Sequence, residues 1–220
     1  MKRAQWRSVF DTYQQACTLL EEYLPKETAT GPGDQKPPAG DPQELLRELH
    51  KLLREGIKSL EQALLRDDQH LGALELEDVL RPFVYLEDEL VQRRLAETKR
   101  SEEWPMLQFE RFQEDSGGDL FFELADERLK DSPGSSTLIY EMLHFCLTAG
   151  FKGRYEDRPA RLRDYKMQLA ERIPQPELAS APPVPVTTGE TRLPEVPYLY
   201  YGVTGFFVLA LPVVLWWSSR

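Results

Sequence analysis

The sequence predicts an all-α fold of about seven helices, followed by one C-terminal transmembrane helix. Three observations predict this fold class. Apolar residues recur at steps of three and four along most of residues 1–173, which is the spacing of amphipathic helices. Proline and glycine separate the amphipathic stretches from one another. Near the end of the chain, residues 196–217 form a run of 22 residues without a charged side chain.

The uncharged run, VPYLYYGVTGFFVLALPVVLWW, has the length and the flanking residues of a membrane span. An α-helix needs about 20 mainly apolar residues to cross the hydrocarbon core of a bilayer. Tyrosines lie near its start and Trp216 and Trp217 at its end, as in the aromatic belts at membrane–water interfaces. A buried helix of a globular core is the alternative, but residues 218–220 offer no partner sequence to cover it. We therefore expect a single span over 196–217 and a short far-side tail at 218–220.

The net charge of the domain before the span limits which partners it can bind. The chain has 27 basic and 37 acidic residues, and Arg220 is the one charged residue after position 195, so residues 1–195 carry a net charge of −11. Such a domain disfavours contact with nucleic acid and with anionic lipid headgroups. The N-terminal stretch MKRAQWRSVF lacks the apolar region of a signal peptide. We therefore expect a cytoplasmic domain that binds no nucleic acid.

The first two helices are expected over residues 4–24 and from Asp41 to about Arg66. Residues 25–40 between them contain four Pro and three Gly, which predicts a flexible loop. Asp41 can cap the second helix, and Pro42 suits the first helical position. A two-stranded coiled coil is an alternative interpretation of the leucine stripe in the second helix. The spacing of the stripe drifts toward 3.6 residues, which favours packing within a bundle.

The third helix is expected over residues 74–97, with a proline in its interior. Pro82 should either kink this helix or begin it afresh. The acidic run Glu87, Asp88 and Glu89 follows. Three consecutive helix positions fan around about 200°, so we expect at least one carboxylate to point toward the bundle or a groove. A solvated acidic face is the alternative.

The segment from Trp104 to Lys130 predicts two short helices that are separated by Gly117 and Gly118. Asp119 is expected to cap the second of the two. A turn is then expected at residues 132–136, where the sequence reads SPGSS.

The stretch 137–149 is apolar over most of its circumference, which predicts a helix at the centre of a bundle. Gly150 should end it in the left-handed conformation, with Phe151 folding back onto the helix. Gly153 supplies a second permissive backbone position. Arg154, just past the helix end, should meet the partial negative charge of that end or a carboxylate inside the fold.

A last helix before the span is expected at about residues 158–173, and the Pro-rich residues that follow predict a semi-extended spacer. The predicted organisation is therefore a cytoplasmic helical domain, a Pro-rich linker, a transmembrane helix and a short tail, at residues 1–173, 174–195, 196–217 and 218–220.

No pattern in the sequence indicates catalysis, a metal site or a cofactor. The two cysteines, Cys17 and Cys146, fall within apolar helical patterns, and the three histidines lack ligand spacing. Phosphate-binding loops, nucleophile elbows and kinase signatures are not found. We therefore predict that the protein is not an enzyme. A tail-anchored enzyme and a general tail-anchored adaptor are the alternatives from other classes.

Two strings carry a resemblance to a known family. They read W-x₂-L-Q-x₆-D-S-G-G-D-x-F-F-x-L from Trp104 to Leu124 and C-L-x₂-G-F-K-G-R-Y from Cys146 to Tyr155. On these motifs the chain resembles, from about residue 5 to 172, the TssL/DotU family of inner-membrane components of type VI secretion; a related family serves type IVB secretion. We interpret the motif residues as mainly structural: Trp104, Gly117, Gly118, Phe121, Phe122, Gly150, Phe151, Gly153, Arg154 and Tyr155.

The resemblance implies a hook-like pair of small helical bundles that self-associates as a dimer. It also implies a TssM-like (IcmF-like) inner-membrane partner and a cytoplasmic baseplate containing a TssK-type protein. The implied function is a structural component that anchors the type VI membrane complex in the bacterial inner membrane and docks the baseplate. The alternative is a DotU-type component of a type IVB system that stabilises an IcmF-like partner.

The acidic run supplies the candidate partner-binding residues Glu87, Asp88 and Glu89. Asp88 and Glu89 match the position of an acidic pair in the family, and we hypothesise that they recruit a basic surface of the baseplate or of the TssM-like protein. A contact of this kind is expected to weaken at high salt.

Overall fold

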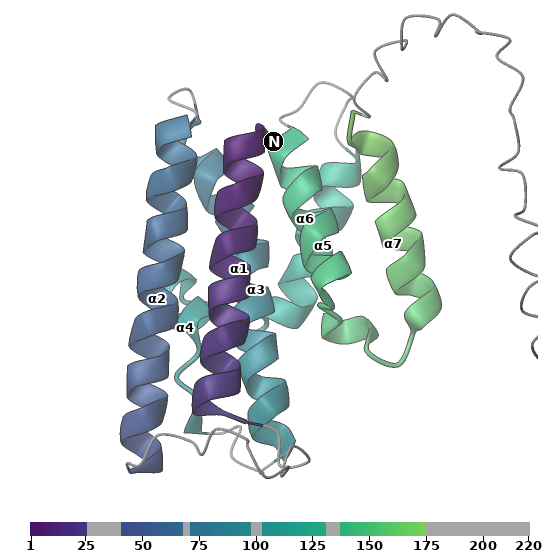
Figure 1. Cartoon of the computed structure of the whole chain (residues 1–220). Coiled ribbons are helices and arrows are strands. Elements are labelled where there is room, and N and C mark those ends of the chain that lie inside the picture. The colour runs from purple at the N-terminus through teal and green to yellow at the C-terminus, as the bar shows by residue number, and fades with distance from the viewer. Residues whose placement is uncertain (26–40, 68–70, 98–102, 131–136, 175–220) are drawn as a thin grey trace, which may run out of the picture. The chain divides into compact units, whose positions relative to one another are not determined.

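A computed structural model of the protein describes residues 1–25, 41–67, 71–97, 103–130 and 137–174. Within these ranges the chain forms seven α-helices, a short 3₁₀ helix (η3) and no strand, all in one compact unit (Figure 1). The all-α prediction is therefore confirmed for this part of the chain. The elements are α1 (Arg3–Tyr23), α2 (Pro42–Asp67), α3 (Ala73–Glu97), α4 (Leu107–Phe112), α5 (Gly117–Lys130), α6 (Thr137–Ala149), η3 (Gly153–Tyr155) and α7 (Pro159–Arg172).

Several predicted features lie wholly or mainly outside the described residues. They are the loop at 25–40, the turn at 132–136, the linker at 174–195, the span at 196–217 and the tail at 218–220. Among the helices that the structure does describe, none combines the length and the apolar character that crossing a bilayer requires.

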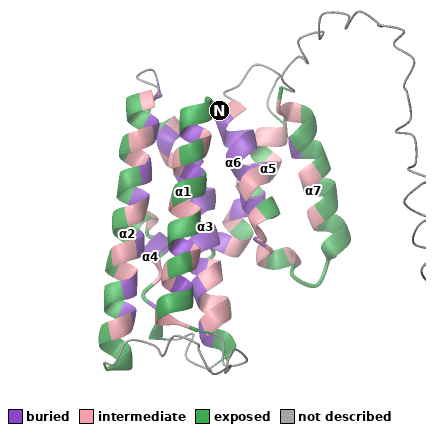
Figure 2. Ribbon diagram, in the orientation of Figure 1, coloured by how far each residue is buried: buried purple, intermediate pink, exposed green. Residues whose placement is uncertain are grey.

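The described helices bury two apolar clusters that share α3. One cluster joins α1, α2 and the second half of α3 to Trp104 and the start of α4. The other joins the first half of α3, with Val9 of α1 and Leu60 and Leu64 of α2, to α5, α6 and α7. Leu90 and Phe112 pack against both clusters, and buried residues follow the inner sides of the helices (Figure 2). Helices α1, α2 and α3 thus each contribute to both clusters, and the hook-like outline stays a prediction.

The start of α2 follows the sequence prediction. The helix begins at Pro42, and the Asp41 carboxylate accepts a hydrogen bond from the Gln43 backbone N–H at 3.2 Å. The stripe of leucines and Ile57 along α2 is buried. This packing within a bundle agrees with the drift of the stripe toward 3.6 residues and leaves no need for the coiled-coil interpretation.

Pro82 does not begin a new helix. Instead, α3 runs without a break from Ala73 to Glu97, with Pro82 buried inside it. A proline in a helix interior removes one backbone hydrogen bond and costs about 3 kcal/mol. Neighbouring helices surround this stretch, and Leu80, Phe83 and Leu86 have no exposed surface. Burial of their side chains, at roughly 1.5–3 kcal/mol each, offsets the cost of the proline.

The start of α5 differs from the prediction by three residues, because Ser116 and not Asp119 takes the cap position. The helix begins at Gly117, and the Ser116 carbonyl accepts hydrogen bonds from the Asp119 and Leu120 N–H groups at 2.9 and 3.0 Å. Asp119 therefore lies in the first turn and is not the cap. Its negative charge there still favours the N-terminal end of the helix dipole.

The end of α6 confirms the predicted glycine cap. Gly150 has a φ of +106°, and the Phe151 N–H donates to the Cys146 carbonyl at 3.0 Å. This bond closes a Schellman motif, which carries the chain back across the helix end. Phe151 is 2% exposed, so it folds into the core as expected.

Candidate functional site

A pocket of about 360 Å³ lies between α3, the start of α5 and the loop after α6. Residues from four separate parts of the sequence form its lining. Six of the residues predicted from the sequence meet there: Asp88, Glu89, Gly117, Gly118, Phe151 and Gly153. The pocket is the place where the acidic run and both motif strings converge, and we take it as the candidate functional site.

Asp88 lines the pocket, but its carboxylate is bound within the fold. It accepts hydrogen bonds from Trp104 Nε1 at 2.7 Å, from the Leu107 N–H at 2.9 Å and from the Gln108 N–H at 2.8 Å. These two N–H groups belong to the first turn of α4, so Asp88 caps that helix from α3. Burial raises the pKa of Asp88, and the three donors act in the opposite direction. Asp88 is 2% exposed.

Trp104, the first residue of the motif, is buried, and its interpretation as a structural residue stays a prediction. It belongs to the cluster that joins α1 and α2 to α3, and its indole N–H donates to Asp88. A buried indole needs such an acceptor, since an unpaired buried donor costs about 1–3 kcal/mol.

Glu89 binds the loop after α6. Its carboxylate accepts from the Lys152 N–H at 3.0 Å and from the Gly153 N–H at 2.8 Å, and it lies 3.6 Å from Arg93 Nε. Burial raises its pKa, which these donors and Arg93 counteract. The side chain keeps 17% of its surface exposed, so it is the one member of the acidic run that is partly open to solvent.

Glu87 points away from the pocket and into the core. It is 1% exposed, and neither carboxylate oxygen has a hydrogen-bond partner in the described structure. Burial raises the pKa of Glu87 well above its ordinary value, and the negative charge of Asp88 adds to the shift. Burial therefore favours the protonated, uncharged form of Glu87, and the near-complete burial of its side chain removes it from the directly accessible partner contacts.

Two backbone segments cross closely at the glycines. A Cβ added to Gly153 would lie 2.6 Å from the Gly118 carbonyl oxygen, and Gly153 itself has a φ of +47°. A Cβ added to Gly117 would lie 2.6 Å from the ring of Tyr85. Contacts this short leave no room for a side chain, so these glycines are required for the start of α5 to approach η3 and α3.

The aromatic motif residues form a cluster behind the pocket wall. Phe121 and Phe151 have ring centroids 4.3 Å apart, and Phe122 lies 4.6 Å from Tyr155 and 5.0 Å from Tyr165. Phe121, Phe122 and Phe151 are buried in the core shared by α3, α5, α6 and α7. The sequence interpretation of these residues as structural agrees with this packing.

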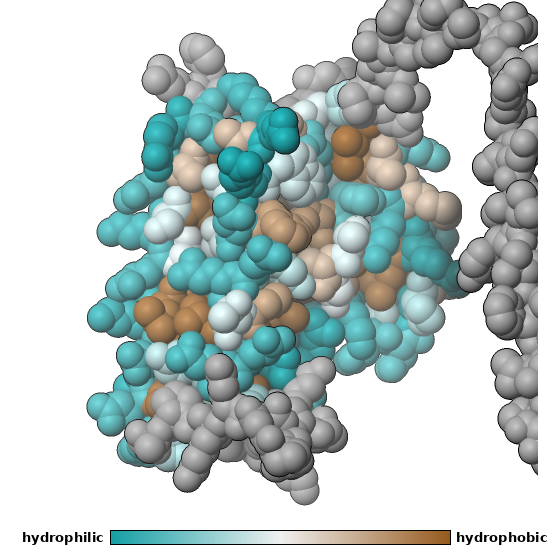
Figure 3. Space-filling model, viewed as in Figure 1, coloured by the Kyte–Doolittle hydropathy of each residue, from teal (hydrophilic) through white to brown (hydrophobic). Residues whose placement is uncertain are grey.

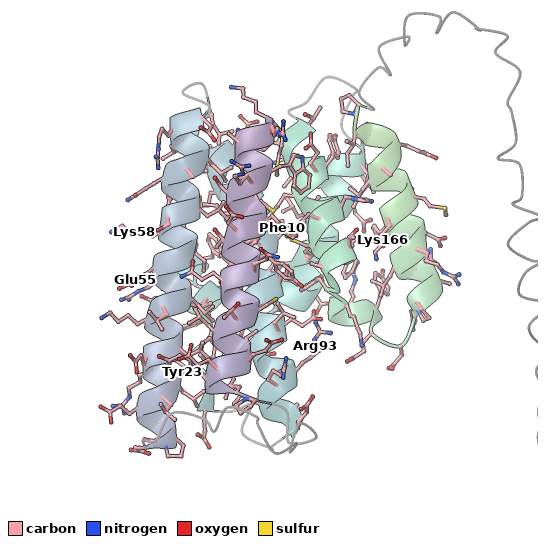
Figure 4. The ribbon with its side chains drawn as sticks, in the orientation of Figure 1. Phe10, Tyr23, Glu55, Lys58, Arg93 and Lys166 are labelled. Carbon is pink, nitrogen blue, oxygen red and sulfur yellow. The ribbon has the colours of Figure 1, made fainter. Side chains whose placement is uncertain are left out.

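Arg154 does not meet the end of α6 or a carboxylate inside the fold. Its guanidinium lies 5.1 Å from the ring centroid of Tyr155 and 5.6 Å from that of Phe122. The carboxylates near it, Asp119 and Asp126 at 3.8 Å, are on the surface of α5. The turn at Gly153 directs Arg154 toward α5, and Arg93 instead binds the end of α6, donating to the Gly150 carbonyl at 3.2 Å (Figure 4).

Sequence reasoning missed the accessible polar groups of the pocket. Asp115 and Glu156 are exposed at its rim, together with Lys152 and Arg93. Gln92 and Arg93 follow Asp88 and Glu89 by four positions, so helical spacing alone could have placed them on the same face. Asp115 and Glu156 come from two loops, and the sequence holds no signal that would bring these loops together.

The arrangement suits binding better than chemistry. Within the described residues, no group of three histidine, cysteine, aspartate or glutamate side chains could hold a metal ion. Asp88 and Glu89 are occupied by donors from the fold, and the rim carries charges of both signs. The pocket is therefore lined by polar groups and by charges of both signs.

Comparisons with known proteins complete the description of the site. A family model described as "Type VI secretion system protein DotU" matches residues 36–219. A solved structure described as the 3D structure of DotU from Francisella novicida is similar at a TM-score of 0.57 and 18% sequence identity, over 79% of this chain and 99% of that chain. At this identity the likeness shows the fold alone. No curated protein matches the chain.

Proposed function

This chain belongs to the DotU family of type VI secretion proteins, and from that membership we propose that it anchors a secretion complex in the bacterial inner membrane and docks the cytoplasmic baseplate. As a member of this family the chain is a component associated with type VI secretion. The proposed partners are a TssM/IcmF-like inner-membrane protein, a TssK-type baseplate component and a second copy of the chain. We assign it no catalytic step.

The observation that carries the proposal is the extent of the family match. It continues from α2 through the last described helix and on across the uncharged run 196–217 to residue 219. The uncharged run is thus part of the family pattern, and its length suits a single span. A helical domain that precedes a membrane anchor, with its N-terminus in the cytoplasm, is suited to linking membrane-bound and cytoplasmic assemblies.

The proposed docking site for a basic partner surface is the rim of the pocket. Glu87 and Asp88 support the fold from inside, whereas Glu89, Asp115 and Glu156 leave carboxylate surface at or near the rim. Reversing charges at Asp88 would also remove the cap of α4, so a binding test needs the exposed residues of the same pocket.

The experiment is affinity purification of the full-length protein from detergent-solubilised membranes, with and without Asp115→Lys and Glu156→Lys together. The reversed charges should repel a basic partner surface and reduce recovery of the baseplate component at least tenfold, since roughly 1.4 kcal/mol of lost attraction produces that change. A matched control reverses Glu55 and Glu123 to Lys, which are exposed on α2 and α5 outside the pocket lining (Figure 4).

The control variant should recover every partner at the wild-type level. Equal recovery of the baseplate component by the pocket variant and the control would exclude the pocket rim as the docking site. Loss of recovery in both variants would indicate an effect of net charge and not of this site.

A further inference from the structure

The segment that ends the described structure differs in charge from the rest of the domain. Residues 150–172 hold seven basic and four acidic residues, a net charge of +3, whereas residues 1–195 together carry −11. Most of the seven lie in α7 and in the turn just before it. A segment of positive net charge in an acidic domain indicates a surface that attracts an anionic partner.

One side of α7 presents basic and apolar residues and is bordered at one edge by two acids. Arg163, Lys166, Met167 and Ala170 follow the spacing i, i+3, i+4 and i+7, so they form a single stripe along the helix, which we call the α7 strip. Asp164 and Glu171 lie three positions before and four positions after Met167, so they border the α7 strip at its Met167 edge. The buried stripe is formed by Leu162, Tyr165 and Leu169, and the α7 strip runs next to it.

The α7 strip is open to solvent. Met167 is 60% exposed, Arg163 and Ala170 are also exposed, and Lys166 is half-buried beside His144 of α6. The helix packs against α6 and η3, and Lys166 lies at the edge of the strip that is next to α6 (Figure 4). On the face shown in Figure 3, hydrophilic residues dominate the described surface and hydrophobic ones gather in separate patches.

The charges of the strip are not neutralised within the fold. In the part of the chain that the structure describes, neither Arg163 nor Lys166 has an acidic partner within 4.0 Å. Arg158 and Arg161 add positive charge at the first turn of α7, which has no acidic residue. Positive charge at a helix N-terminus is unfavourable to the helix dipole. The fold therefore gains nothing from this cluster, which makes an external anionic partner the simpler explanation.

We propose that the α7 strip binds the anionic phospholipid surface of the membrane, with Arg163 and Lys166 at the headgroups and Met167 inserted between them. This inference rests on the proposed membrane anchor. Basic side chains reach phosphates while their alkyl stems lie along the apolar boundary, and exposed Met supplies the apolar contact. The negative remainder of the domain is repelled by the same surface, so the two effects together turn α7 toward the lipid.

The lipid surface is favoured over an acidic protein because of where α7 lies in the chain. Residues 174–195 connect it to the proposed span, and 22 residues reach at most about 75 Å when fully extended. The tether holds the strip near the bilayer at a high effective concentration, so a few charges suffice for contact. The attraction should act within about 8 Å at physiological salt.

The test measures lipid contact at Met167 in the full-length protein. A fluorophore is attached through Met167→Cys in a Cys17→Ser background, where the remaining Cys146 is buried. The protein is reconstituted into nanodiscs of phosphatidylcholine, alone or mixed with phosphatidylglycerol, that carry headgroup-spin-labelled lipid. A second label at Glu55→Cys, on α2, serves as the reference position (Figure 4).

We expect quenching at position 167 in the anionic discs, little in the neutral discs, and none at position 55. Arg163→Glu with Lys166→Glu should weaken surface binding roughly thirtyfold and remove the quenching. The matched variant Lys51→Glu with Lys58→Glu, which changes the net charge equally on α2, should leave it intact.

Equal quenching in neutral and anionic discs, or none at position 167 in either, would overturn the proposal. If quenching is absent and Arg163→Glu with Lys166→Glu instead abolishes recovery of a protein partner, the strip binds an acidic protein. If the full-length chain does not enter nanodiscs, the anchor proposal fails, and sedimentation of the same labelled chain with phosphatidylglycerol vesicles then decides the α7 proposal separately.

Discussion

At the scale of single residues, three adjacent carboxylates of α3 have three different tasks. Asp88 caps α4, Glu89 binds the loop after α6, and Glu87 lies in the core without a hydrogen-bond partner in the described structure. Helix geometry predicts that three consecutive side chains diverge, and one of them was expected to point inward. Which one does so depends on α4 and α6 lying on particular sides of α3, and the local sequence does not contain that information.

Asp88→Ala should destabilise the protein by about 3 kcal/mol. The substitution leaves the Trp104 indole N–H and the first N–H groups of α4 buried without an acceptor. Thermal unfolding of the full-length protein in detergent, followed by tryptophan fluorescence, measures the change. Asp115→Asn, at an exposed position of the same pocket, should change the unfolding free energy by less than about 0.5 kcal/mol. A similar small effect at Asp88 would contradict its role as a cap.

Glu87→Gln should change how stability depends on pH. Burial raises the pKa of Glu87 well above its ordinary value of 4.5 in the folded protein, so the folded state keeps the proton to a higher pH than the unfolded state. The contribution of the Glu87 proton to the free energy of unfolding is complete below the pKa of the unfolded state. It is lost as the pH rises through the higher pKa of the folded state. The unfolding free energy of the wild type should therefore fall relative to Glu87→Gln as the pH rises from about 4.5.

The measurement is denaturant unfolding of both proteins across that pH range. Glu123→Gln, at an exposed glutamate of α5, is the matched control and should follow the wild type at every pH. Parallel curves for Glu87→Gln and the wild type would show that Glu87 is ionised in the folded protein.

At the scale of elements, the crossing of α5 and η3 depends on backbone contact. Gly153→Ala should destabilise the protein by about 2 kcal/mol, because the new Cβ meets the Gly118 carbonyl oxygen at 2.6 Å and φ is +47°. Gly56→Ala is the opposite case. Its Cβ would make an ordinary 3.6 Å contact with Thr12 in a regular helix, so we expect stabilisation by about 0.5–1 kcal/mol. Chemical unfolding of the two variants measures both changes in unfolding free energy. Equal changes in the two variants would contradict the close backbone contact between Gly153 and Gly118.

The bounds of the helices were largely predictable because caps and breakers are local signals. Asp41 with Pro42 placed the start of α2, and Gly150 placed the end of α6. The errors have tertiary causes. Pro82 continues inside α3 because packing around it offsets the lost hydrogen bond, and α5 begins at Gly117 because that backbone lies against Tyr85.

At the scale of the whole molecule, charge and apolar surface are distributed unevenly along the chain. The folded domain is acidic, residues 150–172 are basic, and residues 196–217 have no charge. These features were visible in the sequence, together with the family motifs. The pocket was not, because its rim combines Asp115 and Glu156 from loops whose meeting depends on the packing of α5 and η3 against α3.

The measurement that tests the central claim most directly is recovery of the full-length protein from fractionated bacterial cells, followed by affinity purification in detergent. The account predicts that the chain stays in the membrane fraction after alkaline extraction and co-purifies with an IcmF-like inner-membrane protein and a baseplate component. A chain that remains in the soluble fraction and recovers neither partner would contradict it.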